Sequence, residues 1–327
     1  MAQKILDGVQ KVVVVDRAFD EILEQATQSV RPPEFMIKFY NFMARIPLRI
    51  GVLIFLLTAI DTVQVALNAM RNRTDAALQV IYQYKVRPWR LFWGLGDHVW
   101  QSSYNCRSVR ARGIFTREAI EYLLEKVVGS SLTIASLGSG SASQILQGVS
   151  DNNSRGNEIR LILVDNDLRA LEVGRRNAQD LGIEDLVDSR EVTVGKFLKS
   201  QPADSLDLVE MVGLADYFDD DRFSSYLHDI YRSLKKNGCF LGANITSEEE
   251  APFAHKIACW PRMHYREKEE IKNQLEEAGF KNFWTGNCGL YTVWVAQKEE
   301  SPPHHYKKSP IHSICCNTCI MYGVCFF

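Results

Sequence analysis

Two short features of the sequence have the residue types needed to bind a nucleoside cofactor. Gly138, Ser139 and Gly140 follow an apolar run, and Asp165 ends the next apolar run. Glycine in such a turn lets a ligand approach the backbone, and a carboxylate at the end of the following strand can accept hydrogen bonds from a ribose diol. Their separation exceeds the usual interval of about 20 residues, and we interpret the polar segment 151–157 as a surface insertion. Together they predict a nucleoside-cofactor site.

Both features also have purely structural explanations. Residues 138–140 can be no more than a tight turn, and Asp165 can cap a helix, although Asn166 or Asp167 suits that cap better. The pattern also departs from the dinucleotide fingerprint, because Ser143 stands at its sixth position. A nicotinamide oxidoreductase is therefore disfavoured.

The elements that would position these residues alternate between strand and helix. We predict strands over 132–137, 159–164, 190–194, 205–212 and 239–244, and two more around 287–289. We predict that one helix begins at Thr116 and that another starts at Asp219 and ends at 236–238. The second terminal strand is expected as a hairpin partner at the sheet edge. This alternation predicts an α/β fold with a Rossmann-like, doubly wound, seven-stranded mixed sheet.

The chain divides into three regions on its sequence pattern. Residues 1–113 show helical spacing of apolar positions and are predicted to be an all-helical N-terminal region. Residues 114–298 contain the alternating elements, and 299–327 lose all periodicity and are expected to be a disordered, cysteine-rich tail. Cys316 and Cys319 form a CxxC motif without a second pair at a regular distance, so we predict no metal site.

Charge and apolar runs limit the classes of function. A formal net charge of −2 excludes a globally basic nucleic-acid coat. The N-terminus lacks the apolar core of a signal peptide. The apolar run 50–60 has eleven residues, whereas a membrane span needs about twenty. We interpret it as a buried helix, with peripheral membrane contact as the alternative, and expect a cytoplasmic protein with reduced core cysteines.

Five ordered segments point to the cofactor. The segments are LTIASLGSGSA, LILVDNDLRALEVGRRNAQDLG, SLDLVEMVGLADYF, LKKNGCFLGANI and EEAGF. Over about 115–298 this order resembles the class I S-adenosylmethionine-dependent methyltransferases. The resemblance implies that S-adenosyl-L-methionine is the cofactor. It places Gly138, Ser139 and Gly140 at the methionine and ribose, and Asp165 at the ribose hydroxyls. It also places Asn166, Val194 and Gly195 at the adenine, and Val212 and Gly213 on the methionine side.

The sequence departs from that family at two positions. The family usually has an acidic residue where this chain has Ser136, and often an aspartate near Lys196. Losing both would weaken cofactor binding unless other residues substitute. A narrower resemblance, carried by 213–218, 243–246 and 260–266, is to bacterial methyltransferases of the hydroxy-fatty-acid methyl ester type, which also place a helical region before the catalytic domain.

The methyl acceptor would lie beyond the strand ends. A sulfonium methyl is already activated, so its transfer needs mainly positioning and exclusion of water. A carboxylate acceptor needs no base, whereas a hydroxyl or amine needs a nearby proton acceptor. Our catalytic candidates are Tyr217, Asn244 and His264, each in a segment that follows a strand end. His264, like His255, can equally be a surface or capping residue.

Segment 84–117 combines basic and aromatic residues and has three interpretations. It can be a stacking and charged surface for RNA, a lid whose arginines bind a cofactor or substrate carboxylate, or an aromatic junction between the helical and catalytic regions. The lid interpretation adds Arg112 to the cofactor site. We predict a methyltransferase for a small-molecule or lipid acceptor, with nucleic acid disfavoured as a partner. The alternatives are an RNA methyltransferase and a non-catalytic, cofactor-binding scaffold.

Overall fold

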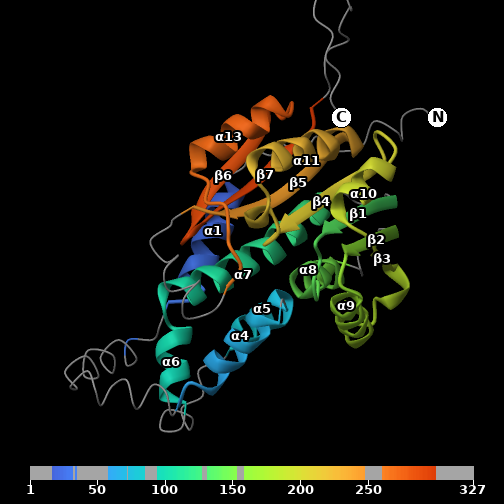
Figure 1. Cartoon of the computed structure of the whole chain (residues 1–327). Coiled ribbons are helices and arrows are strands. Elements are labelled where there is room, and N and C mark those ends of the chain that lie inside the picture. The colour runs from blue at the N-terminus through green and yellow to red at the C-terminus, as the bar shows by residue number, and fades with distance from the viewer. Residues whose placement is uncertain are drawn as a thin grey trace, which may run out of the picture.

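A seven-stranded mixed sheet runs through the centre of the molecule (Figure 1). The computed structural model describes residues 17–31, 34, 58–71, 73–84, 94–126, 131–152, 158–246 and 260–299. The strands are β1 (Ser131–Leu137), β2 (Glu158–Asp165), β3 (Val187–Glu191), β4 (Leu206–Val212), β5 (Leu234–Ile245), β6 (Asn282–Cys288) and β7 (Tyr291–Gln297). Their order is β3-β2-β1-β4-β5-β7-β6. Strands β1 to β5 are parallel, and β7 is antiparallel to both β5 and β6.

Helices cover both faces of the sheet, which explains why its central strands are almost continuously apolar. One face packs against α7 (Tyr104–Glu125), α8 (Ser143–Asn152) and α9 (Leu168–Asp180). The other face packs against α10 (Val194–Ser200), α11 (Asp220–Ser233) and α13 (Lys268–Glu277). Successive side chains along a central strand point to opposite faces of the sheet. In β1, for example, Ile134 lies in one core and Ala135 in the other. The predicted doubly wound mixed sheet is confirmed.

Three predictions are wrong, those for β3, for the helix after Asp219 and for the edge of the sheet. The third strand covers Val187–Glu191 rather than 190–194, because Val194 packs into the core as the first residue of α10. The helix after Asp219 ends at Ser233, and β5 is already under way where we predicted its end at 236–238. At the C-terminal end β6, not β7, is the edge strand. All seven residues of β7 are buried. Such a strand is favoured inside the sheet, where it has a neighbouring strand on both sides.

The N-terminal region is helical where it is described. It contains α1 (Ala18–Ser29), α4 (Ile60–Met70), α5 (Thr74–Tyr82) and α6 (Leu95–Gln101), of which the last three lie together beside α7 (Figure 1). Helix α1 packs instead on α7 and β6, where Trp284 contacts Phe19 and stacks on Phe115 at a ring-centroid distance of 5.5 Å.

The predicted helix start at Thr116 is wrong. Helix α7 has 22 residues and begins at Tyr104, with the Ser103 side chain accepting a hydrogen bond from the Cys106 backbone N–H. Thr116 lies inside the helix, where its hydroxyl donates to the carbonyl of Arg112 at 2.8 Å. The proposed boundary between 113 and 114 therefore falls within one continuous helix. Helix α7 therefore packs both on the N-terminal helices and on the sheet.

Several predictions fall outside the described residues. These are residues 153–157 of the insertion predicted at 151–157, most of the apolar run 50–60 and the tail from 300 to 327. The first two residues of the predicted insertion instead complete α8. In the part of the chain that is described, no helix has the length and apolar character to cross a membrane. The same part contains no group of His, Cys, Asp and Glu side chains arranged to hold a metal. Cys106, Cys239 and Cys288 are buried thiols.

Candidate cofactor cavity

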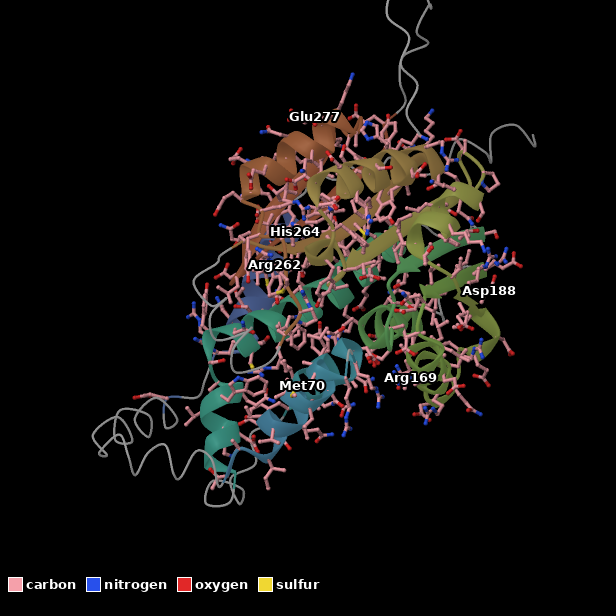
Figure 2. The ribbon with its side chains drawn as sticks, in the orientation of Figure 1. Met70, Arg169, Asp188, Arg262, His264 and Glu277 are labelled. Atoms are coloured by element: carbon pink, nitrogen blue, oxygen red, sulfur yellow. The ribbon has the colours of Figure 1, made fainter. Side chains whose placement is uncertain are left out.

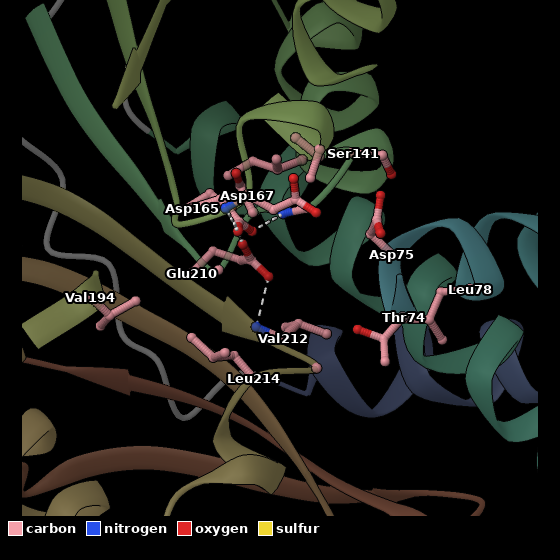
Figure 3. A pocket seen from close by; sticks show the side chains of 18 of the residues that line it. Thr74, Asp75, Leu78, Ser141, Asp165, Asp167, Val194, Glu210, Val212 and Leu214 are labelled. Atoms are coloured by element: carbon pink, nitrogen blue, oxygen red, sulfur yellow. Dashed lines mark hydrogen bonds between the residues drawn. The ribbon is translucent and has the colours of Figure 1, made fainter. Parts of the chain in front are cut away.

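A cavity of about 560 Å³ lies at the carboxyl ends of β1, β2 and β4 (Figure 3). The chain order reverses across β1, whose neighbours are β2 and β4. Open α/β sheets bind ligands in the crevice outside such a switch point. Of the predicted cofactor residues, those lining the cavity are Gly138, Ser139, Gly140, Asp165, Asn166, Val194, Val212 and Gly213.

The turn after β1 has the backbone shape that requires glycine. Gly138 and Gly140 have φ values of +65° and +52°. The backbone N–H groups of Gly138 and Ser139 both donate to the carbonyl of Val164, at 2.8 and 3.0 Å, which holds the turn against β2. A Cβ atom at Gly138 would lie 2.6 Å from the Leu214 side chain. Any side chain there would displace the cavity wall.

Asp165 connects the two loops that line the cavity. Its Oδ2 accepts from the Gly140 backbone N–H at 2.8 Å, and its Oδ1 accepts from the Asp167 N–H at 2.9 Å. Asp167, not Asp165, caps α9 by accepting from the Arg169 N–H at 3.0 Å. Each carboxylate oxygen of Asp165 has a further acceptor position. Asp165 therefore holds the glycine turn in place and can still accept from a ligand hydroxyl.

Glu210 is the cavity residue that our sequence reasoning missed. It lies on β4 directly opposite Ser136 of β1, and the Ser136 hydroxyl donates to its Oε2 at 2.5 Å. Its Oε1 accepts from the Val212 backbone N–H at 2.8 Å. Glu210 thus places a carboxylate on the neighbouring strand, directly beside position 136. Lys196, the second departure, is exposed on α10 and does not line the cavity.

Burial dominates the electrostatics of Glu210. The residue is 7% exposed, and desolvation raises the pKa of its carboxyl to about 7. Hydrogen bonds from Ser136 and Val212 and the positive charge of Arg112 act in the opposite direction. Because these three groups favour the ionised form, they limit the rise in pKa, and the carboxyl titrates near neutral pH.

Part of the cavity wall comes from the N-terminal helices. Thr74, Asp75 and Leu78 of α5 face the strand ends across the cavity (Figure 3). Asp75 approaches the glycine turn closely, since a Cβ atom on Gly140 would lie 3.3 Å from the Asp75 Cβ. No motif in the sequence identified these residues, because their position depends on how α5 packs against α7.

Gly195 and Arg112 do not line the cofactor cavity. Gly195 faces Tyr226 instead. Arg112 is buried on a smaller cavity of about 40 Å³, which shares Leu78, Gly213 and Tyr217 with the larger one. One Arg112 nitrogen donates to the Tyr82 hydroxyl at 3.2 Å, and another lies 3.9 Å from Asp216.

The three catalytic candidates lie in different places. Tyr217 lines both cavities, and its hydroxyl accepts from the Trp260 indole N–H at 3.0 Å. Burial raises the pKa of the Tyr217 phenol, and the negative charge of Asp216 raises it further. Asn244 and His264 line neither cavity.

Asn244 and His264 belong to a structural network behind the site. The Asn244 amide donates to the carbonyls of Ile245 and His264, and its oxygen accepts from Arg266 at 2.9 Å. The His264 side chain is exposed (Figure 2), while its backbone N–H donates to the carbonyl of Asp216 at 2.7 Å. His255 lies outside the described residues.

Segment 84–117 is largely internal where it is described. Trp100 is buried, Phe115 stacks on Trp284, and Arg112 is 2% exposed. Arg110 donates to the side chain and backbone oxygens of Gln101 at 3.0 and 2.6 Å. Residues 85–93 of this segment lie outside the described residues.

Comparison with known proteins supports the assignment of the fold. No protein-family model and no curated protein sequence matches the chain. Among solved structures, a possible exported protein from Bordetella parapertussis is similar with a TM-score of 0.59 and 15% identity, over 86% of this chain and 96% of the other. Over that length the chain shares the fold of this protein, with its own sheet in the strand order β3-β2-β1-β4-β5-β7-β6.

Two further solved structures show weaker similarity. An O-methyltransferase family protein from Burkholderia thailandensis matches at 14% identity and a TM-score of 0.49, over 74% of this chain and 72% of that protein. The CurJ carbon methyltransferase matches at 13% identity and a TM-score of 0.49, over 74% of this chain and 68% of that protein.

Proposed function

We propose that the protein is an S-adenosylmethionine-dependent methyltransferase that acts on a small-molecule or lipid acceptor. The cavity at the switch point carries this proposal, because a glycine turn and two carboxylates meet on its wall. Its volume of about 560 Å³ falls within the range of about 300–1,000 Å³ that is typical of small-molecule and cofactor sites. The positive φ angles at Gly138 and Gly140 leave backbone open to a bound ligand.

Each part of the cavity has a proposed role toward the cofactor. When bound, the cofactor supplies a methyl group on a sulfonium, which transfers without further activation. Asp165 accepts hydrogen bonds from the ribose hydroxyls, and Asn166 and Val194 border the adenine. Helix α5 covers the cavity on the side opposite the strand ends, which excludes water from the reacting groups.

We propose that the acceptor binds in the larger cavity beside the smaller one, whose volume of about 40 Å³ is too small to hold an acceptor by itself. The wall of the smaller cavity is mainly apolar or aromatic, with Val65, Leu78, Ile81, Trp100, Val109, Ile245, Trp260, Met263 and Tyr291. An acceptor with apolar surface fits such a wall. Tyr217 stands between the two cavities, and its raised pKa keeps the phenol protonated, so that it donates a hydrogen bond to the acceptor rather than removing a proton. Asn244 and His264 remain weaker candidates because neither lines a cavity.

An RNA acceptor is the less favoured alternative. RNA recognition by segment 84–117 needs exposed aromatic rings for stacking. Trp100 and Phe115 are instead buried, as is Arg112. A non-catalytic scaffold would bind the cofactor and would transfer no methyl group to any acceptor. The cytoplasm remains its proposed location, in keeping with the buried thiols of Cys106, Cys239 and Cys288.

Calorimetry with S-adenosylhomocysteine tests the proposed cofactor. We expect the wild type to bind and Asp165→Asn to bind more weakly, because the amide can accept at only one of the two oxygen positions. Asp188→Asn is the matched control, since Asp188 lies on the neighbouring strand β3 and pairs with Arg160 and Arg190 outside the cavity. No binding to the wild type at millimolar ligand contradicts the proposed function. Unchanged binding to Asp165→Asn contradicts only the role of Asp165.

Transfer of a labelled methyl group then tests the acceptor. We expect label from S-adenosylmethionine to enter apolar acids, phenols or amines and not RNA. Tyr217→Phe should lower the rate by removing a hydrogen bond while it preserves the ring that lines both cavities. Label in RNA alone would instead favour the RNA methyltransferase.

A further inference from the structure

The glycine turn lies between two carboxylates that differ in their surroundings. Asp165 ends β2 on one side of Gly138, and Glu210 lies on β4 on the other. We propose that Glu210 binds the ammonium group of the cofactor's amino-acid part and releases its own proton when that group binds. This inference rests on the proposed function. In the exchange the carboxyl O–H bond breaks, the proton passes to the buffer, and the ligand ammonium keeps its charge.

The register of the sheet places Glu210 at this point. Residues 136 and 210 are directly paired in the parallel β1–β4 ladder, so a carboxylate on either strand reaches the same end of the cavity. Figure 3 shows Glu210 between Asp165 and Val212 with its hydrogen bond to the Val212 N–H. The hydrogen bond from Ser136 restrains the other oxygen. Both oxygens keep one acceptor position each, as a ligand N–H donor requires.

The charges around Glu210 favour a cation. The other acidic residues that line the cavity are Asp75, Asp165 and Asp167, and its described lining includes one basic residue, Arg222. Asp167 is paired with Arg169 outside. Glu210 forms no ion pair with a described residue, although Arg112 acts on it from a longer distance. Tyr82, Tyr217 and Tyr226 are the other titratable groups of the described lining, which has no histidine.

Assigning the ammonium to Glu210 follows from the position of the two carboxylates. Asp165 adjoins Asn166 at the end of β2, where the methyltransferase resemblance places the ribose and adenine. Glu210 adjoins Val212 and Gly213 at the end of β4, which the same resemblance assigns to the methionine side. A ligand with a diol at one end and an ammonium group at the other therefore has Asp165 next to the diol and Glu210 next to the ammonium group.

Binding of a cation must shift the protonation of Glu210. Burial raises the pKa of this carboxyl to about 7, so about half of the carboxyl groups carry the proton at pH 7. An ammonium favours the ionised form. The apparent affinity for the ligand therefore falls in proportion to the ionised fraction of Glu210. This fraction drops by about eightfold from pH 7.5 to pH 6.0.

Calorimetry of S-adenosylhomocysteine binding in buffers of different ionisation enthalpy measures both effects. For the wild type we expect the dissociation constant to rise by about eightfold from pH 7.5 to 6.0, with about half a proton released per ligand at pH 7. For Glu210→Gln we expect weaker binding at pH 7.5, little pH dependence and no proton release. The glutamine oxygen can still accept from the Val212 N–H while its NH2 group donates to the Ser136 hydroxyl, which favours a retained fold, checked by circular dichroism.

Two controls isolate the interaction. Methylthioadenosine has the nucleoside but lacks the amino-acid part, so its binding should depend little on pH and should be equal in wild type and Glu210→Gln. Asp207→Asn removes a carboxylate from the same strand, where it pairs with Lys235 outside the cavity, and should keep the wild-type pH dependence.

Ser136→Ala is a separate test of the same carboxyl. It removes a hydrogen bond that favours the ionised form of Glu210, and should move the pH dependence of binding to higher pH.

The outcomes separate this inference from the proposed function. No binding of S-adenosylhomocysteine or methylthioadenosine to the wild type overturns the proposed function and this inference with it. Binding of S-adenosylhomocysteine without proton release, with equal affinity in Glu210→Gln, overturns only the role of Glu210. Equal pH dependence for both ligands overturns it as well, because the ammonium would then not be the group concerned. If Glu210→Gln does not fold, the shift in Ser136→Ala decides.

Discussion

Glu210→Gln should make the ligand-free protein more stable above neutral pH. Glu210 is buried in the cavity wall, and its pKa is raised from 4.5 to about 7 in the folded state. Below pH 4.5 the carboxyl is protonated in both the folded and unfolded states, so it contributes no pH dependence there. Between pH 4.5 and 7 the unfolded chain ionises while the folded protein keeps its proton, which lowers the free energy of unfolding of the wild type.

The size of the effect follows from the difference between the two pKa values. One pKa unit corresponds to about 1.36 kcal/mol, so the wild type loses roughly 3 kcal/mol between acidic pH and pH 8. Glutamine does not titrate and avoids this loss. Urea unfolding of both proteins at pH 5, 6, 7 and 8 measures the difference. We expect the advantage of Glu210→Gln to grow by roughly 2 to 3 kcal/mol from pH 5 to pH 8.

Asp188→Asn supplies a control of opposite sign. Burial by itself raises the pKa of Asp188, but hydrogen bonds from Arg190 and Arg160 outweigh it and lower the pKa. This carboxylate therefore stabilises the fold above its unfolded pKa, and that contribution is lost as the pH falls through its folded value. Asp188→Asn should be less stable than wild type at pH 7 and approach it in acid. A constant difference between Glu210→Gln and wild type from pH 5 to 8 would refute the reasoning about burial.

Three further substitutions test the site and its supports. Gly138→Ala should abolish S-adenosylhomocysteine binding in calorimetry and lower stability by about 1–3 kcal/mol, because φ is +65° and the new Cβ would meet Leu214. Trp284→Ala should cost about 2–4 kcal/mol in urea unfolding, because Phe19 of α1 and Phe115 of α7 both pack on that ring. Asn244→Ala should cost about 1–3 kcal/mol, because Arg266 and the carbonyls of Ile245 and His264 each lose a hydrogen bond, with ligand affinity unchanged at a temperature where the variant is folded.

Local pattern was sufficient for the strands and turns closest to the larger cavity. Strands β1, β2 and β4 agree with the predicted runs to within one residue, because strands buried on both faces must be apolar along their whole length. The glycine turn and Asp165 follow these runs directly, so their place at the strand ends could be read from the sequence. Strand β3 was misplaced, because its residues are only partly buried and carry no such pattern.

Residues that meet only through packing could not be predicted in the same way. Ser136 and Glu210 are 74 positions apart and share a hydrogen bond because β1 pairs with β4. Thr116 has the residue type of a helix cap, yet α7 runs through it because that helix is buried on both sides of the position. His264 looked catalytic from its place after a strand, but its side chain faces solvent.

The sequence by itself determined the alternation of strand and helix, the glycine turn and the carboxylate at the end of β2. These depend on periodicity and on neighbours within a few positions. The tertiary structure alone decided which strands are adjacent, that a carboxylate on β4 lies beside position 136, and that α5 forms part of the cavity wall with Asp75. The physical reason is that hydrogen-bonded register and helix packing join distant segments, and burial then sets the charge state of what they enclose.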